Sequence, residues 1–386
     1  MKTLNYSELK RRMELDGATA TTRHLTEALD QGSLAPEDFS LRDLAETLVD
    51  NGAQWVRSLD PRNDSVQLSE SDGADLTAFL NVTGQIIHTK IRQAYEHEAF
   101  VLSKAVSTIP TKFSSEKIPG IGRVADKSME VQPGMPYPNV GLSEEYTRTP
   151  ETTKHGLIVP VTREAVFFDR TNLILRRAEE AGEVLGLNKE KRLIDCVLGI
   201  TNTYSFNGTS YNTYYATTGS PWINSLASNE LVDYTDVDKA EQLFAELSDP
   251  SSGEPILISP NAVLVMPAYR YAAAKVFLDG EITFDPTGSA SMTARNPLRH
   301  YQVMESALAY RQLVASGISA VNAKKYWFLG DFKKAFAWME NWPITVTRSQ
   351  ASSDANFERD IIARFKASER GAAAVLDPRY VVKSIG

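Results

Sequence analysis

The sequence predicts an α+β protein made of several compact parts and one long projection. Three observations predict this class: a helical pattern over residues 171–198, a polar segment rich in proline and glycine over residues 111–154, and short apolar strands that alternate with helices after residue 236. A chain of 386 residues exceeds the usual size of one domain, so we expect about two or three compact units.

The composition excludes several classes of function. Lys and Arg number 41 against 49 Asp and Glu, and the net charge of −8 argues against a protein whose main task is to grip phosphate backbones. The single cysteine, Cys196, excludes an internal disulfide and a cysteine-based zinc site. No apolar run reaches the roughly 18–20 residues that cross a bilayer, and the start has no apolar signal core. We therefore expect a soluble protein with no membrane partner, made in a reducing cytoplasm.

The N-terminal region, residues 1–73, is predicted to be helical in small pieces. Ser40 followed by Asp43 predicts a capping box at the start of one piece. The simpler interpretation is a small helical appendage, and the alternative is an arm that docks on another subunit. Residues 74–109 then predict one long amphipathic helix that Pro110 ends.

Residues 111–156 are predicted to form an extended arm. Five prolines exclude a helix, and the strand-like stretches 122–131 and 145–161 favour two strands that run out and back. An isolated hairpin is marginally stable in water, so a neighbouring subunit is the expected support. The charged residues expected to contact that neighbour are Arg123, Lys127, Glu130, Glu144, Glu145 and Arg148.

A long helix follows the arm. Thr171 can cap it, it runs to about Leu198, and Gly199 is the expected stop. Its charged residues, Glu190 among them, are expected to lie on a solvated side.

Further on, residues 256–259 and 263–266 predict short strands, and Pro267 predicts the start of a helix that stops at Gly280. Residues 361–368 alternate as a half-buried strand does, and Arg370-Gly371 predicts a turn.

A search for chemistry finds no catalytic, cofactor-binding or metal site, so we expect no enzyme and no cofactor. The glycines of residues 120–125 match a relaxed dinucleotide pattern, but no buried strand precedes them and prolines forbid the helix that must follow. Asp233, Asp236 and Asp238 lack the glycine and distal glutamate of a calcium loop, so helix capping explains them better. The tyrosines of residues 204–215 could stack on a ligand, but packing of loops on a sheet is the simpler explanation.

The succession of these features resembles the major capsid proteins of tailed phages, which have the Hong Kong 97-type fold. Three stretches carry the resemblance: LIVPVTREAVFFDRTNLILRRAEEAGEVLGLNKEKRLIDCVLG, FLGDFKKAFAWMENWPITVTRSQ and FERDIIARFKASERGAAAVLDPRYVV. It covers roughly residues 74–386, and no single motif is diagnostic, because architecture rather than invariant residues unites that family.

The resemblance implies five parts. They are an N-terminal helical region (1–73), a long helix (74–110), an extended β-hairpin arm or E-loop (111–156), a peripheral domain with the long spine helix (157–200 and 328–386), and an axial α/β domain (201–327).

The resemblance also implies self-assembly as hexamers and pentamers into an icosahedral shell, assembled in the host cytoplasm and found in the virion. The shell would enclose double-stranded DNA without sequence-specific binding. Further partners would be cement or decoration, scaffolding and portal proteins. Some relatives cross-link an arm lysine to an asparagine, for which Lys112, Lys117 or Lys127 and Asn341 or Asn356 are candidates, but we expect no cross-link here. Two alternatives stay open: an encapsulin-like nanocompartment shell and, less favoured, a cytoplasmic α/β enzyme.

Overall fold

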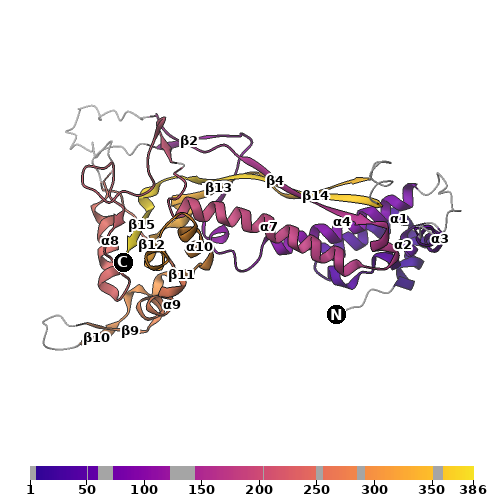
Figure 1. Cartoon of the computed structure of the whole chain (residues 1–386), viewed down its shortest axis with the longest axis horizontal. Coiled ribbons are helices and arrows are strands. Elements are labelled where there is room, and N and C mark those ends of the chain that lie inside the picture. Colours follow the sequence, from indigo (N-terminus) through magenta and orange to yellow (C-terminus); the bar gives the residue numbers. More distant parts are fainter. Residues whose placement is uncertain are drawn as a thin grey trace, which may run out of the picture. The chain divides into compact units, whose positions relative to one another are not determined.

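The structure is a computed structural model of the whole chain (Figure 1). It describes residues 6–49, 51–59, 73–121, 144–202, 204–248, 255–284, 292–350 and 360–386. The chain forms two compact units, each assembled from three separate segments. The first unit comprises Met1–Ala99, Lys154–Asn188 and Trp342–Arg370, and the second comprises Phe100–Thr153, Lys189–Asn341 and Gly371–Gly386.

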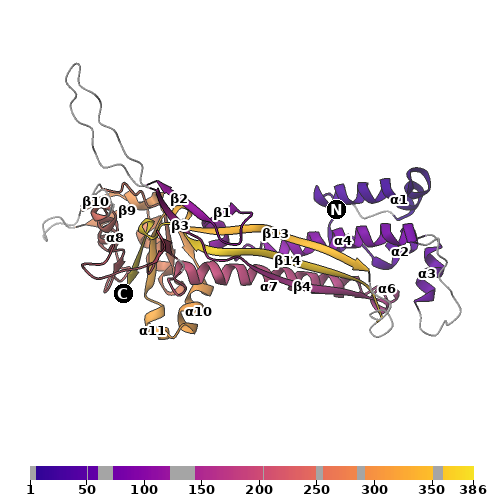
Figure 2. The same ribbon diagram turned by 90° about the horizontal axis from the view of Figure 1, so that it is seen from above.

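The N-terminal helices belong to the first unit and share its core. They are α1 (Tyr6–Asp30), α2 (Leu41–Leu48), α3 (Gly52–Ser58) and α4 (Gly73–Tyr95). Figure 2 shows α1 alongside α4. Their fully buried side chains include Leu25, Leu44, Phe79 and Ile87. The expectation of small helical pieces was wrong for the first of them, because α1 spans 25 residues with a kink at Gly17.

The expected capping box at Ser40 forms only in half. The Ser40 side chain accepts a hydrogen bond from the Asp43 backbone N–H at 3.1 Å, which confirms the N-cap of α2. The Ser40 N–H donates to the Tyr6 hydroxyl oxygen at 2.7 Å instead of to Asp43. Tyr6 thus ties the start of α1 to the start of α2.

We expect Tyr6 to make the first unit sensitive to alkali. Burial raises the pKa of Tyr6 to about 12, nearby carboxylates add to the shift, and the Ser40 N–H works against it. The folded state therefore keeps a proton that the unfolded chain loses near its ordinary value of 10.0, so this contribution is present below that pH and is lost as pH rises through about 12. Tyr6→Phe should be less stable by about 1 kcal/mol at neutral pH, because it leaves the Ser40 N–H without its acceptor.

The measurement is thermal unfolding of both proteins from neutral pH to about 12. The gap in melting temperature should narrow above pH 10, since only the wild-type protein loses the Tyr6 contribution. The other tyrosines are the same in both proteins, so the difference isolates Tyr6. A gap that stays constant over this range would show that Tyr6 is not linked to alkaline stability.

The predicted helix over residues 74–109 was wrong in its second half. Helix α4 ends at Tyr95, α5 (Leu102–Ala105) is a single turn, and Ser107–Pro110 form strand β1. This strand pairs in parallel with β13 (Phe336–Gln350), from Ser107 opposite Ala337 to Pro110 opposite Glu340. A partner more than 200 residues away therefore overrides the local helical pattern.

Helix α7 (Thr171–Val197) confirms the predicted long helix. Gly199 has φ +72°, the Gly199 N–H donates to the Cys196 carbonyl, and the Ile200 N–H donates to the Asp195 carbonyl, which confirms the predicted stop. Thr171, however, is the first helical residue rather than the cap. Its hydroxyl accepts from the Leu41 N–H at 2.9 Å and donates to Asp169 at 2.8 Å.

A five-stranded mixed sheet forms the centre of the second unit. Its order is β11 (Gln302–Glu305), β8 (Ala262–Val265), β12 (Tyr326–Gly330), β15 (Val381–Ile385) and β7 (Ser225–Leu226). Figure 1 shows α8 (Tyr234–Glu246) beside β15. Strand β15 and residues 328–330 of β12 lie in the segment that the sequence assigned to the peripheral domain. In the structure, β12 pairs with β15 on one edge and on the other edge with β8, which lies in the segment assigned to the axial domain. The side chains that fill this core include Val263, Leu264, Trp327, Phe328 and Val381.

Two local predictions in this part of the chain were also wrong. Residues 256–259 form no strand, and only an isolated bridge joins Ser248 to Pro255. Gly371 does not turn the chain, because β14 (Ile361–Val375) runs straight through it. A Cβ on Gly371 would lie 2.5 Å from the Trp338 ring, so this position needs glycine for close packing rather than for a turn. The alternation predicted for residues 361–368 is confirmed by burial of every second residue from Ile361 to Phe365.

Candidate inter-subunit arm

The described root of the arm is an antiparallel pair of strands in a four-stranded sheet of the second unit, whose order is β2-β3-β5-β6. Strand β2 (Lys117–Ile121) pairs with β3 (Glu144–Arg148), from Lys117 opposite Arg148 to Ile121 opposite Glu144. The expected outgoing strand over residues 122–131 lies outside the described residues. The expected return strand is split, because β3 ends at Arg148 and β4 (Thr153–Thr162) begins after a break.

Backbone and threonine hydrogen bonds close the base of this ribbon. The Thr149 N–H donates to the Glu116 carbonyl at 2.9 Å, and the Glu116 N–H donates back to the Thr149 hydroxyl at 2.8 Å. The Ser115 hydroxyl donates to the Thr149 carbonyl at 2.7 Å, and the Thr152 N–H donates to the Ser114 carbonyl at 2.7 Å. The described ends of the arm are therefore fixed to each other at their base.

Asn341 fastens the outgoing chain to β13. Its side-chain amide donates to the Thr111 carbonyl at 3.1 Å and to the Phe113 carbonyl at 2.9 Å, while the Thr111 N–H donates to the Glu340 carbonyl at 2.8 Å. Asn341 was one of the two asparagines considered for a cross-link. The amide nitrogen that such a reaction would expel is here engaged in holding the arm root.

Glu190 holds the segment that leads into β1. Its carboxylate accepts from the Leu102 N–H at 2.7 Å, the Ser103 N–H at 2.8 Å and the Ser103 hydroxyl at 2.5 Å. Only 1% of Glu190 is exposed, so its placement on a solvated side of α7 was wrong. Charge and helical spacing place a glutamate on the surface by default, and only the donors from a distant segment reverse this.

Two cations of α7 lie against Trp338 of β13. Arg192 donates to the Gly371 carbonyl at 2.6 Å and to the Thr153 hydroxyl at 2.8 Å, and its guanidinium carbon lies 5.0 Å from the centre of the Trp338 ring. The Lys189 ammonium lies 5.1 Å from the same ring. The Trp338 ring thus lies close both to these two cations and to the backbone of Gly371.

We expect Glu190→Gln to destabilise the second unit. An amide can accept on one oxygen only, so at least one buried donor of Leu102 or Ser103 loses its acceptor, at about 1–3 kcal/mol. Urea unfolding of the full chain should show this loss. The matched control is Glu183→Gln, an exposed glutamate of the same helix, which should stay within about 0.5 kcal/mol of the wild-type protein. Equal stability of the two variants would contradict the anchoring role of Glu190.

The tyrosine-rich loops pack against the arm root. Strand β3 pairs with β5 (Ser205–Phe206) at Thr147, and the Tyr146 backbone exchanges hydrogen bonds with Asn207 at 2.9 and 3.0 Å. The aromatic rings of this region contact one another, which confirms the packing interpretation; they belong to Tyr204, Phe206, Tyr211, Tyr215 and Trp222. Burial raises the pKa of Tyr204 far above its ordinary value, as expected for a ring inside a core.

Of the six charged arm residues selected from the sequence, the structure places one side chain. Arg148 is exposed at the end of β3, and its Nε donates to the Ser115 hydroxyl at 3.4 Å. Glu144 and Glu145 are positioned only by their backbone in β3. Arg123, Lys127 and Glu130 lie outside the described residues. The residues that anchor the root, Asn341 and Glu190 above all, had no signal in the sequence, because single asparagines and glutamates are common.

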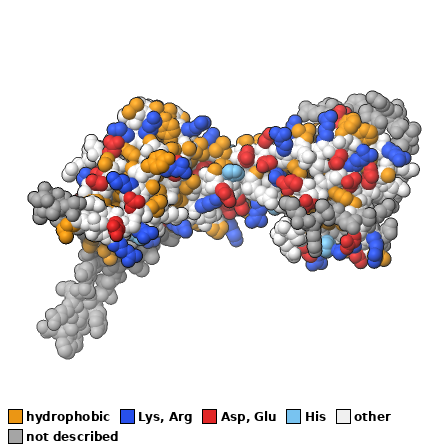
Figure 3. Space-filling model, turned by 90° about the horizontal axis from the view of Figure 1, so that it is seen from below, with side chains coloured by type: hydrophobic (Ala, Val, Ile, Leu, Met, Phe, Trp, Pro, Cys, Tyr) orange, Lys and Arg blue, Asp and Glu red, His pale blue; other side chains and the backbone are white. Residues whose placement is uncertain are grey.

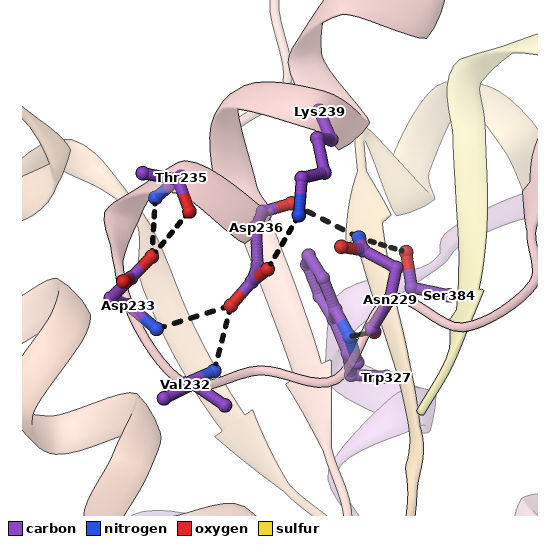
Figure 4. A network of polar contacts seen from close by, with 8 residues as sticks. All are labelled: Asn229, Val232, Asp233, Thr235, Asp236, Lys239, Trp327 and Ser384. Carbon is purple, nitrogen blue, oxygen red and sulfur yellow. Dashed lines mark hydrogen bonds and ion pairs between the residues drawn. The ribbon is translucent and has the colours of Figure 1, made fainter.

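Asp233 and Asp236, two of the three aspartates for which capping was expected, cap α8 (Figure 4). The Asp233 side chain accepts from the Thr235 N–H at 2.8 Å, and Asp236 accepts from the Val232 and Asp233 N–H groups at 3.0 and 3.2 Å. Burial acts to raise the pKa of Asp236, but these donors and Lys239 outweigh it, so the pKa is lowered. Among the described residues, no group of three or more His, Cys, Asp or Glu could hold a metal ion.

Beneath this cap, one asparagine joins the helix to the sheet. The Asn229 side-chain amide donates to the Asp236 carbonyl at 3.0 Å and to the Ser384 hydroxyl at 3.3 Å, and the Trp327 indole donates to the Asn229 carbonyl at 2.8 Å (Figure 4). The cap, α8, β12 and β15 therefore form one connected support. Such a network is explained by structure and needs no ligand.

None of the helices in the described part of the chain combines the length and the apolar character that crossing a bilayer requires. A family model described as "Phage capsid protein" matches residues 145–384. This is more than half of the chain, so the chain belongs to the phage capsid protein family. The recognition made from the sequence is thereby confirmed, and the α+β class is the one observed. Membership in this family points to a structural shell protein rather than an enzyme.

Solved structures of low sequence identity resemble the chain. The capsid of a native GTA particle is 13% identical, with 75% of this chain and 90% of that chain covered and a TM-score of 0.45. The Mycobacterium phage Bobi structure is 14% identical, with 74% and 89% covered and a TM-score of 0.40. An encapsulin complex from Synechococcus elongatus is 13% identical, with 74% and 86% covered and a TM-score of 0.41. No curated protein matches the sequence.

Proposed function

We propose that this chain is the major capsid protein of a tailed phage or prophage. It assembles as hexamers and pentamers into an icosahedral shell around double-stranded DNA. The observation that carries the proposal is the arm root, since a ribbon clamped at its base by the second unit is suited to present residues 122–143 to a neighbouring copy. In a closed shell, the same surface meets the same partner surface in every subunit.

Within this proposal, residues 1–73 and 74–110 form the N-terminal region, and residues 111–156 form the arm. Residues 157–200 and 328–386 form the peripheral domain, and residues 201–327 form the axial domain. The charged arm residues pair with surfaces of the next subunit. Cement, scaffolding and portal proteins are the further partners of a shell that is assembled in the host cytoplasm and retained in the virion.

The charge distribution supports enclosure of DNA without tight binding. The chain carries a net charge of −8, and on the face that Figure 3 draws, basic and acidic side chains are interspersed. Binding to phosphate backbones requires many basic groups that act together. A shell that must be filled with DNA and emptied again works better with a surface that does not strongly attract phosphate groups.

The test is electron microscopy with light scattering of the purified full-length protein. Closed particles of megadalton mass with five-fold and six-fold capsomers are expected, and particles made in cells that carry the complete phage locus should contain nuclease-protected DNA. Closed particles filled with a protein cargo instead would favour the encapsulin-like alternative. A small soluble oligomer with no closed particles under any assembly condition would overturn the proposal.

A further inference from the structure

A basic pocket lies in the second unit, where β10 (Met292–Arg295) leads into the 3-10 turn Pro297–His300. Strand β10 is paired with β9 (Glu281–Phe284), and Figure 1 shows this ribbon beside α9 (Arg270–Ala273). The pocket has a volume of about 560 Å³. Its lining residues are Arg295, Asn296, Pro297, Arg299 and His300. Three of these five side chains are basic, and none is acidic.

The backbone that carries these groups is held in place by Asn296, which is 3% exposed. Its side-chain amide donates to the Val276 carbonyl at 2.8 Å and to the Asp279 carbonyl at 3.0 Å, and its side-chain oxygen accepts from the Leu298 N–H at 2.9 Å. Both amide hydrogens and the amide oxygen of this buried side chain are therefore engaged. The pocket is therefore built on a fixed corner rather than on a loose loop.

The positive charges of the two arginines at this corner are not balanced by ion pairs with other described residues. Within the described residues, no hydrogen bond or ion pair engages the Arg295 or Arg299 guanidinium, and both side chains are exposed. His300 Nδ1 lies 3.0 Å from the Pro297 carbonyl, and its ring lies 4.1 Å from the Tyr301 ring, which fixes its orientation. In the pairing of β9 with β10, the acidic residue Glu281 lies opposite Arg295, but Glu281 does not line the pocket.

We propose that this pocket binds a compact anion with several phosphate groups, of the size of a triphosphate. Guanidinium groups present paired donors that match phosphate oxygens, and two of them beside a histidine suit more than one phosphate. The volume lies within the roughly 300–1,000 Å³ of pockets for small ligands. A chain with a net charge of −8 has no general affinity for anions, so binding here depends on these few residues. The site does not depend on the proposed shell function.

The test is isothermal titration of the full-length protein with sodium tripolyphosphate at low salt. The double variant Arg295→Gln, Arg299→Gln should weaken binding by about tenfold or more. The matched control, Arg311→Gln, removes an exposed arginine of α10 (Ala307–Ala315) and should bind like the wild-type protein. Both variants should keep the wild-type melting curve, because the substituted side chains are exposed.

A short duplex oligonucleotide, used as a competitor, distinguishes the source of the phosphate. Weaker binding of the duplex than of tripolyphosphate supports a free polyphosphate ligand. Tighter binding of the duplex with the same dependence on Arg295 and Arg299 would overturn that source and assign the site to nucleic-acid phosphates. No measurable binding of tripolyphosphate, or equal losses in the double variant and in Arg311→Gln, would overturn the pocket itself.

Discussion

Replacing residues 121–142 with a short Gly-Ser turn should leave a folded, soluble subunit that no longer forms closed particles. The arm root is held by its own chain through Asn341, Thr149 and the β1–β13 pairing, so the second unit keeps its anchors when the outer segment is removed. Ordering of the outer segment costs roughly 1–2 kcal/mol per residue in backbone entropy, which contacts with a neighbouring subunit must offset.

Circular dichroism and cooperative melting check the fold of this variant, and electron microscopy checks assembly. A second variant, in which the same residues are replaced by a Gly-Ser segment of equal length, should also fail to assemble, because the contacts rather than the length are lost. Normal closed shells from either variant would show that the arm is not the clamp between subunits. Failure of the shortened chain to fold would show that the arm belongs to the core.

The exposed charges of the arm should contribute less than the arm as a whole. Neutralising Arg148 alone removes a side chain that contacts Ser115 at the surface, and exposed ion pairs are worth only about 0–1 kcal/mol each. Assembly multiplies such small terms over many copies of one contact. The Arg148 variant should therefore form fewer closed particles than the wild-type protein. Added salt should cause a similar loss of particles in the wild-type protein, because salt screens exposed charges.

Gly182→Ala should destabilise the first unit although alanine is the better helix former. A Cβ at this position of α7 would lie 2.4 Å from the Ile91 carbonyl oxygen and 2.9 Å from the Ala94 Cβ of α4. Both helices must then move apart, at about 1–3 kcal/mol, which outweighs the gain of up to about 1 kcal/mol in helix propensity.

Chemical denaturation of the full chain measures this effect. Gly280→Ala is the matched control, because the same change there meets no atom within 4 Å, and it should be close to neutral. Gly182→Ala with unchanged or raised stability would show that α4 and α7 can separate freely. That result would contradict a rigid crossing of the two helices at Gly182.

Elements whose signals lie within a few residues could be predicted well. The C-terminal end of α7, the alternation of β14 and the capping aspartates of α8 all depend on neighbours in the chain, such as Gly199 or Asp233. Part of the candidate site was visible in the same way, since prolines and charges marked the arm. Its anchors were not, because Glu190 and Asn341 look like ordinary surface residues until their distant partners are known.

The sequence by itself determined the α+β class, the long helix and the resemblance to phage capsid proteins, because periodicity, proline and glycine act locally. Only the tertiary structure decided that Ser107–Pro110 form a strand, that Gly371 lies beneath Trp338 and that Glu190 is buried. In each case a group more than 30 residues away supplies the hydrogen bond, the strand or the ring. Local propensities are worth less than about 1 kcal/mol per residue, so one such contact is enough to override them.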